Sequence, residues 1–243
     1  MEKKVNYDTK VLTEGCENLG ITLSDRQIEQ FMIYYEYLIE KNKVMNLTGI
    51  TEFKEVMIKH FVDSLAVVKA VDMEKINSLL DLGTGAGFPG IPLKIVFPEI
   101  KMVLLDSLNK RIKFLNEVID KCRLENISAI HGRAEDLARN KEYRESFDLC
   151  VSRAVANLSS LSEYCIPYVK EGGLFISYKS GNIDIELNNA ERAIRLLGGN
   201  NQNVVRFQLP GSEIDRSLVV IHKEKITPAK YPRKAGIPVK EPL

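Results

Sequence analysis

The feature that most constrains the fold is a short apolar run that passes directly into a glycine loop. Leu79, Leu80 and Leu82 surround Asp81, and glycine then occupies positions 83, 85 and 87. Glycines at alternate positions let the backbone turn sharply and approach a ligand with no Cβ atom in the way. Pro89 follows, and the first turn of a helix tolerates proline because the missing N–H would have no partner there. The sequence therefore predicts a buried strand, a tight turn and a helix.

Short apolar runs alternate with helical stretches from about Ser78 onward. The expected strands are Ser78–Leu82, Met102–Asp106, Ile127–His131, Phe147–Ser152 and Leu174–Tyr178. The helical stretches between them include Leu108–Arg123, Leu158–Val169 and Ile183–Leu197. This alternation is typical of βαβ units, and it predicts an α/β fold with a doubly wound parallel sheet.

The last two expected strands follow a different pattern. Asn203–Leu209 and Ser217–His222 are joined by Pro210 and Gly211, which leaves no room for a helix between them. They should pair as an antiparallel hairpin at the edge of the sheet, making seven strands in all.

The region before the sheet is expected to be helical. Ser24 can cap a helix in which apolar residues recur at helical spacing from Ile28 to Ile39, and a second amphipathic stretch runs from Glu52 to Val71. We expect a single domain overall, with a helical cap over residues 1–72, a core over 73–222 and a basic tail over 223–243.

Composition excludes several classes of protein. No apolar run approaches the ~18 to 20 residues that cross a bilayer, and the N-terminal residues lead into no signal-peptide segment, so a cytoplasmic location is expected. The four cysteines are scattered without a C-x-x-C pair, which argues against a structural zinc site and fits free thiols. The net charge of +1 is not that of a typical nucleic-acid-binding module.

Basic residues concentrate only in the tail from Ile221 to Leu243. They are Lys223, Lys225, Lys230, Arg233, Lys234 and Lys240, against Glu224 and Glu241. Two interpretations stay open, a solvated and partly ordered terminus or an arm that contacts phosphates.

The glycine loop fits two cofactors. Gly85, Gly87 and Gly90 satisfy the G-x-G-x-x-G pattern of dinucleotide-binding folds, with Asp106 placed for a ribose hydroxyl. Asp81, Gly83, Gly85 and Gly87 together also form an acid-x-G-x-G-x-G pattern. In this pattern the carboxylate of Asp81 could attract the ammonium group of S-adenosylmethionine. The turn begins at Gly83, before the dinucleotide pattern would start, and the terminal hairpin resembles a methyltransferase sheet. We favour the methyl donor.

Acidic residues follow the next two strands. Asp106 can accept both ribose hydroxyls of the donor, and it can also cap the helix that begins near Leu108. Ala134 and Glu135 follow the third strand, where a backbone N–H and a carboxylate can bind the adenine edge.

Motifs that the chain lacks narrow the methyl acceptor. The segment after the fourth strand, residues 152–157, contains no Pro-Pro-aromatic loop of the kind used to methylate exocyclic amines. Cys165 is followed rather than preceded by proline, unlike the nucleophile of pyrimidine carbon methylation. An acceptor that needs no covalent activation remains, and guanine N7 fits because its lone pair is free. This route needs alignment of the reactants and no dedicated general base, so His60, His131 and His222 are not expected to be catalytic.

A set of motifs in a fixed order resembles the RsmG (GidB) family of bacterial 16S ribosomal RNA guanine-N7 methyltransferases. The set comprises Asn46-Leu47-Thr48, His60-Phe61-x-Asp63-Ser64, the Asp81–Pro92 loop, Leu104-Leu105-Asp106-Ser107 with Lys110-Arg111, Ala134-Glu135, Ser152-Arg153-Ala154, Lys179-x-Gly181 and Tyr231-Pro232-Arg233-Lys234-x-Gly236-x-Pro238. Any one triplet is unspecific, whereas the ordered set spans nearly the whole chain.

The resemblance implies a class I S-adenosylmethionine-dependent methyltransferase fold with an N-terminal helical extension. It implies a guanine of 16S rRNA in the small ribosomal subunit or its precursor as acceptor, guanine 527 in the usual RNA numbering, and no metal. Cofactor contacts are then expected at Gly83, Gly85, Gly87, Phe88, Asp106, Ala134, Glu135 and Arg153. Arg153 is also expected to orient the guanine, and RNA-side candidates are Asn46, Thr48, His60, Asp63, Ser64 and Lys179.

Three rival functions remain open at this stage. They are methylation of a small molecule or protein, a donor-binding regulatory module without turnover, and a nicotinamide oxidoreductase. Arg153 and the RNA-side candidates also allow interpretations without a role in function. An arginine after a strand can form a surface ion pair, which contributes little. The candidates in the helical cap can instead pack or cap its helices.

Overall fold

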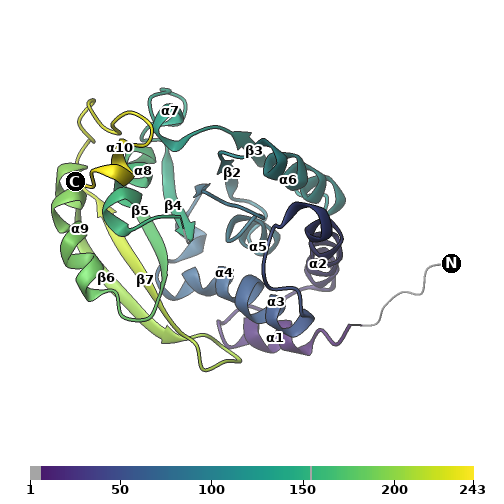
Figure 1. Cartoon of the computed structure of the whole chain (residues 1–243). Coiled ribbons are helices and arrows are strands. Elements are labelled where there is room, and N and C mark those ends of the chain that lie inside the picture. Colours follow the sequence, from purple (N-terminus) through teal and green to yellow (C-terminus); the bar gives the residue numbers. More distant parts are fainter. Residues whose placement is uncertain (1–6, 154) are drawn as a thin grey trace.

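A seven-stranded sheet forms the centre of the molecule (Figure 1). The structure, a computed structural model, describes residues 7–153 and 155–243, in which the strands follow the order β3-β2-β1-β4-β5-β7-β6. The strands are β1 (Ser78–Leu82), β2 (Lys101–Asp106), β3 (Ile127–His131), β4 (Phe147–Arg153), β5 (Val169–Ser180), β6 (Gly199–Gln208) and β7 (Asp215–Lys223). The first five run parallel, and β7 pairs antiparallel with both β5 and β6. The predicted mostly parallel sheet with a terminal hairpin is confirmed.

Helices cover both faces of the sheet and enclose two apolar cores. α5 (Gly90–Val96) and α6 (Asn109–Lys121) lie on one face, and α8 (Leu158–Cys165) and α9 (Asp184–Leu196) lie on the other. Short turns, η4 (Ile166–Tyr168) and α7 (Ala134–Leu137), complete the second layer. Buried aliphatic and aromatic side chains from each layer pack onto the strands and form two separate clusters.

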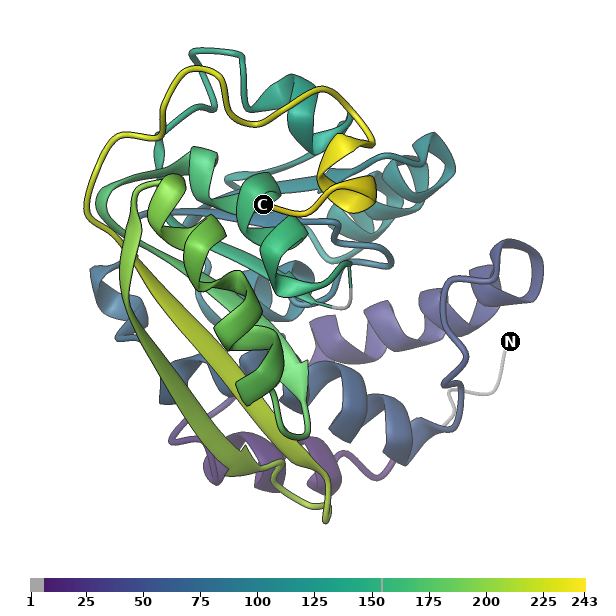
Figure 2. The ribbon, with the colours of Figure 1, turned by 60° about the vertical axis from the view of Figure 1, so that its left-hand side comes forward.

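The N-terminal helices pack on the face that carries α5 and α6 (Figure 2). They are α1 (Lys10–Glu17), α2 (Asp25–Met45), α3 (Phe53–Val56), η1 (Met57–Val62), α4 (Asp63–Leu65), η2 (Ala66–Lys69) and η3 (Met73–Lys75). Ser24 caps α2 as predicted, and Gln27 returns a bond to the Ser24 backbone. Tyr34 of α2 donates its hydroxyl to the Ala86 carbonyl, so the cap contacts the glycine loop directly.

The second amphipathic stretch is not one regular helix. Between α3 and α4 the backbone adopts a π-helical turn, η1, which contains His60. A π turn adds a residue to the turn and leaves the apolar pattern recognisably helical, so side-chain spacing does not reveal it. Such turns often occur at functional sites.

The basic tail folds back onto the core. Lys223, Thr227 and Tyr231 are buried, and the short helix α10 (Ile237–Lys240) lies beside α8 (Figure 2). Of the two interpretations left open for the tail, a solvated and partly ordered terminus does not fit these buried residues. Burying these groups requires partners for their polar atoms, which composition alone cannot show.

Candidate active site

A cavity of about 410 Å³ opens at the carboxyl ends of β1, β2 and β3. In a doubly wound sheet this edge is where ligands bind. We call it the donor cavity. Its lining is Leu82, Gly83, Leu105, Asp106, Ser107, Leu108, Gly132, Arg133, Ala134, Glu135, Val155, Tyr164 and Gly236. Four predicted cofactor residues, Gly83, Asp106, Ala134 and Glu135, thus come together there.

The glycine turn is held by the neighbouring strand. The N–H groups of Gly83 and Thr84 both donate to the Leu105 carbonyl, at 2.8 and 3.2 Å. Gly83 has a φ of +72°, and a Cβ atom there would collide with the side chain of Val155. Gly85 has a φ of +62°, with open space where a Cβ would lie. Glycine is required at both positions by conformation, and at Gly83 also by close packing.

Asp106 lies at the end of β2 and bonds to the backbone on both sides of the donor cavity. Its Oδ1 accepts the N–H of Leu108 at 2.9 Å, so it fixes the residue before α6, although Leu108 and not Asp106 occupies the N-cap position. Its Oδ2 accepts the Gly85 N–H at 3.0 Å and the Arg111 guanidinium at 3.1 Å. A carboxylate has about four acceptor positions, so one remains for a hydroxyl in the cavity. This residual capacity fits a ribose.

Glu135 lies in the first turn of α7 and is 6% exposed. Its Oε1 accepts the backbone N–H of Gly236 at 3.0 Å, from the tail. The Ala134 carbonyl accepts the Tyr168 hydroxyl at 2.6 Å, which fixes the start of α7 against the sheet. Ala134 and Glu135 therefore occupy anchored positions in the wall where an adenine was expected.

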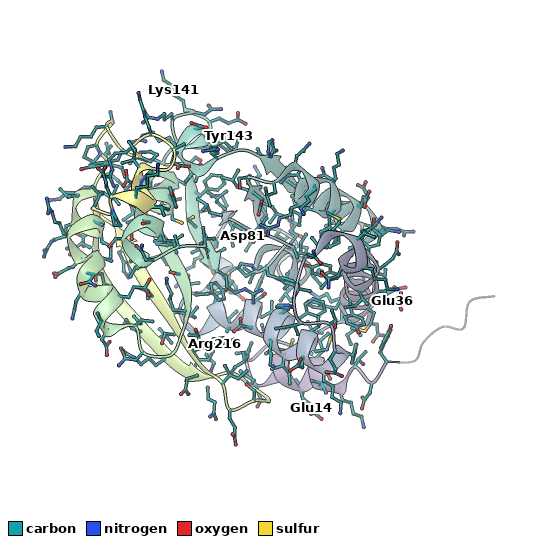
Figure 3. The ribbon with its side chains drawn as sticks, viewed as in Figure 1. Glu14, Glu36, Asp81, Lys141, Tyr143 and Arg216 are labelled. Atoms are coloured by element: carbon teal, nitrogen blue, oxygen red, sulfur yellow. The ribbon has the colours of Figure 1, made fainter. Side chains whose placement is uncertain are left out.

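Asp81 does not line the donor cavity, contrary to the expectation that it faces the donor. It is fully buried at the centre of the molecule (Figure 3), and its Oδ2 accepts the Thr84 hydroxyl at 2.6 Å and the Gly90 N–H at 2.8 Å. Its Oδ1 has no partner among the described residues. Burial raises the pKa of Asp81 to about 7. Asp81 therefore braces the glycine turn from inside.

Gly87 and Phe88 also point away from the donor cavity. A Cβ at Gly87 would contact Ile91 and the Tyr34 hydroxyl, so this glycine allows α2 to approach the loop. The Phe88 ring stacks with His60, and the Arg153 guanidinium lies 5.1 Å from its centre. Neither residue lines the donor cavity.

A second cavity of about 400 Å³, the acceptor cavity, is lined by Ile50, Lys59, His60, Asp63, Arg153, Tyr178, Lys179, Ser180 and Arg216. Arg153 ends β4, and β4 is the neighbour of β1, whose end leads into the donor cavity. The two cavities therefore lie next to each other along the same edge of the sheet. Three predicted RNA-side residues, His60, Asp63 and Lys179, line this one together with Arg153.

Asp63 holds two arginines in the acceptor cavity. Its Oδ2 lies 2.8 Å from Nη1 of Arg153, and its Oδ1 lies 2.7 Å from Nε of Arg216. Asp63 is 3% exposed, so this carboxylate is almost completely removed from water. Charge-assisted bonds of this kind fix a guanidinium strongly. Arg153 is therefore not a loose surface ion pair.

His60 is neutral in this structure. Burial, reinforced by the charge of Arg153, lowers the pKa of its imidazole to about 3. Nη2 of Arg153 faces Nδ1 at 3.5 Å, which assigns the ring proton to Nε2, and Nε2 lies 2.7 Å from the Thr48 hydroxyl. The imidazole thus links Thr48 to Arg153 and is not a proton acceptor for catalysis near neutral pH.

The remaining RNA-side candidates have different positions. Lys179 bonds to Glu186 at 2.7 Å and to the Ala156 carbonyl at 3.1 Å. Ser64 is buried and its hydroxyl donates to the His60 carbonyl, so it stabilises the N-terminal helical cap. Asn46 is exposed in a left-handed conformation at the end of α2 and does not line the acceptor cavity. Ala154 of the Ser152-Arg153-Ala154 motif lies outside the described residues.

Sequence analysis did not identify two residues that shape the acceptor site. Arg216 of β7, labelled in Figure 3, is the second cation that binds Asp63. The side chain of Asn42 bonds to the N–H groups of Leu47 and Thr48, which orders the loop after α2. Neither residue lies in a recognisable motif, although an arginine beginning the last strand was a visible signal.

The family described as GidB, rRNA small subunit methyltransferase G, matches residues 27–219. The chain belongs to this family. A GidB-family protein of Lachnoclostridium phytofermentans, named ribosomal RNA small subunit methyltransferase G, is 54% identical over 97% of this chain and 98% of its own. One with the same name from Acetivibrio thermocellus is 49% identical over the full length of both chains.

The fold resembles that of solved methyltransferases. An O-methyltransferase from Bacillus cereus, solved in complex with SAH, superposes with a TM-score of 0.54 over 78% of this chain and 90% of its own, at 16% identity. The class I fold predicted for this GidB-family chain is confirmed, as is the prediction of an S-adenosylmethionine-dependent methyltransferase. The nicotinamide alternative is not supported.

The structure also limits other kinds of site. Over residues 7–153 and 155–243, no cluster of three or more His, Cys, Asp or Glu side chains could hold a metal ion. In the same part of the chain, no helix is both long enough and apolar enough to cross a membrane. All four cysteines are buried with free thiols.

Proposed function

We propose that this protein transfers a methyl group from S-adenosylmethionine to N7 of a guanine in 16S ribosomal RNA, guanine 527 by family resemblance. The supporting observation is the pair of adjoining cavities at one sheet edge, one with a ribose-compatible carboxylate and one with clustered cations. The partner is the small ribosomal subunit or its precursor, in the cytoplasm. The family description supports ribosomal RNA over a small-molecule or protein acceptor.

The donor cavity suits an adenosyl ligand on observations independent of any relative. Asp106 retains one acceptor position for a ribose hydroxyl, and Gly83 has no Cβ atom that would displace the lining residue Val155. Glu135 adds a nearly buried carboxylate to the lining of the same cavity. S-adenosylmethionine supplies an electrophilic methyl group at this site. Of the predicted contacts, Gly83, Asp106, Ala134 and Glu135 line the cavity, while Gly85 orders Asp106.

The acceptor cavity suits guanine because its donors match the base edge next to N7. Guanine O6 is a strong acceptor, and guanidinium groups bind it well. Arg153 is held by Asp63, so it can orient the base with little loss of conformational freedom. His60 is neutral and stays neutral, which agrees with an acceptor atom that carries no proton to remove. Lys59 pairs with Glu55 and Lys179 with Glu186 at the edge of the same cavity, and each would exchange this partner for a flanking phosphate when RNA binds.

Transfer of radiolabel tests the proposal. Methyl-tritiated donor is incubated with naked 16S rRNA, with small subunits and with assembly intermediates, all from cells that lack the gene. We expect label in 16S rRNA and one strand-cleavage stop after N7-specific chemistry, mapped by primer extension. Label confined to a protein or a small molecule, or a stop at a position other than a guanine, would overturn it. The Arg153→Ala variant should give little label with each RNA preparation.

A further inference from the structure

The C-terminal tail supplies part of the donor cavity, although its lining residue, Gly236, lies 101 residues after Glu135 in the sequence. Gly236 is one of the lining residues, and its N–H donates to Glu135 at 3.0 Å. Gly236 has a φ of +83°, a left-handed conformation that aims the N–H at this carboxylate. The tail therefore reaches the wall expected to contact adenine.

A buried ion pair anchors the tail just before Gly236. Glu163 of α8 is fully buried, and its two carboxylate oxygens accept the backbone N–H of Arg233 at 2.7 Å and the guanidinium at 2.7 to 3.1 Å. A buried carboxylate without a partner is costly, so Glu163 requires the tail to be docked. Arg233 also donates to the Glu241 carbonyl at 2.8 Å, which closes the segment into a loop.

Further bonds hold the rest of the segment. The buried Ser160 hydroxyl donates to the Pro238 carbonyl at 2.6 Å. Arg139 donates to the Pro232 carbonyl at 2.6 Å, and Arg144 to the Tyr231 carbonyl at 3.0 Å. Tyr231 itself is buried in the core on the α8 face. A terminus bound at this many points is part of the folded structure and not a free arm.

We propose that the segment Tyr231–Glu241 is a donor-binding element that positions Glu135 through the Gly236 N–H and closes the adenine side of the donor cavity. The inference rests on the proposed location of the donor site. Arg233 acts as a positioning residue, because it touches the cavity only through the segment it anchors. Arg233 and Lys223 are occupied inside the protein, so only part of the tail's positive charge is available to RNA.

This arrangement couples tail docking to donor binding. A ligand that binds only the docked state stabilises that state, and docking in turn raises the affinity for the ligand. The effect should fall on the donor and not on RNA. That distinguishes a donor-binding element from a phosphate-contacting arm.

Calorimetric titration with S-adenosylhomocysteine tests the coupling in Arg233→Ala, with the exposed neighbour Lys234→Ala as matched control. We expect Arg233→Ala to weaken binding about tenfold, which corresponds to about 1.4 kcal/mol, and Lys234→Ala to bind as the parent does. The KM for the donor should rise in Arg233→Ala, with kcat and the KM for rRNA unchanged. Combined with Glu135→Gln, the loss should be less than the sum of the two single effects, because both act through one contact.

Unchanged donor affinity in Arg233→Ala, or a raised KM for rRNA alone, would overturn the inference. If Arg233→Ala fails to fold, hydrogen exchange of the parent protein decides. Saturating S-adenosylhomocysteine should then slow hydrogen exchange in residues 231–241. An unaltered exchange rate there would contradict the proposal that this segment binds the donor. Failure of the parent to bind the ligand at all would instead refute the donor site itself.

Discussion

The imidazole ring of His60 stacks on the phenyl ring of Phe88, with ring centroids 4.5 Å apart and ring planes 18° apart. His60 comes from the π-helical turn of the N-terminal cap, and Phe88 comes from the glycine loop. The Arg153 guanidinium lies over the same phenyl ring. One aromatic side chain of the glycine loop therefore packs against two groups of the acceptor cavity.

Replacing Phe88 should impair catalysis more than folding. Aromatic pairs contribute about 0.5 to 1.5 kcal/mol beyond buried area, so Phe88→Leu should lower single-turnover methylation roughly 2- to 10-fold. Phe97→Leu is the matched control, because Phe97 is only partly buried at the end of α5, away from both cavities. Equal rates for the two variants would show that the stack does not organise the site.

Arg153→Ala should cost about 100-fold in kcat, the size of effect seen when one preorganised donor is removed from an active site. Asp63 keeps Arg216 as a partner in this variant, so the fold should survive, with a Tm within a few degrees of the parent. Arg206→Ala removes an exposed arginine of β6 and should leave activity unchanged. A fully active Arg153→Ala enzyme would assign this arginine a purely structural role.

Methylation should be nearly independent of pH between about 6 and 8.5. The proposed acceptor atom loses no proton, and the pKa of His60 lies near 3. Asp81, whose pKa is about 7, lines neither cavity, so its ionisation should affect the rate little. The observable is the single-turnover rate at saturating donor and rRNA. A tenfold change per pH unit on the acidic side would indicate a general base that titrates in this range, and would contradict the proposed chemistry.

His60 should make folding stability depend on pH. Its pKa falls from the usual 6.5 to about 3 on folding, so below pH 6.5 the unfolded chain binds more protons and stability decreases as pH falls. The loss grows by about 1.4 kcal/mol per pH unit, reaching about 2 kcal/mol at pH 5. Asp81 has the opposite sign, because a pKa raised to about 7 gives stability that is lost as pH rises from 3.8 to 7.

Urea unfolding of the parent and of His60→Gln at pH 7.5 and pH 5.0 separates the two contributions, since Asp81 is common to both proteins. The parent should lose about 2 kcal/mol more than His60→Gln between these pH values. An equal change in both would show that His60 is not buried in its neutral form.

Sequence patterns predicted the sheet well because strands and their turns are local. Ser78–Leu82 and Ile127–His131 were predicted with the bounds that the structure has. The terminal hairpin was predicted too, although residues 209–214 connect its strands and not Pro210 and Gly211 alone. Cavity residues that directly follow or end a strand, such as Asp106, could be predicted from the sequence. Contacts between residues that are distant in sequence could not be predicted. Nothing near Asp63 shows that Arg216 lies against it, and nothing near Glu135 indicates Gly236.

The role of Asp81 shows a second limit. An acidic residue before a glycine turn can face a ligand or hold the turn from inside. The same sequence pattern is compatible with both arrangements. Only burial and the bonds to Thr84 and Gly90 distinguish them.

Three glycine-to-alanine substitutions separate backbone strain from blockage of the donor cavity. Gly20, Gly83 and Gly85 all have φ between +62° and +78°, so each alanine variant should lose about 1 to 2 kcal/mol of stability. Only at Gly83 would the new Cβ collide with Val155, while the other two positions face open space. S-adenosylhomocysteine affinity should therefore fall most in Gly83→Ala and should not fall in Gly20→Ala. Gly85→Ala should have an intermediate effect, because the N–H of residue 85 orders Asp106.

A second substitution, Val155→Ala, should restore part of the affinity of Gly83→Ala. Equal affinities for all three single variants would mean that the Gly83 turn is not part of the donor site.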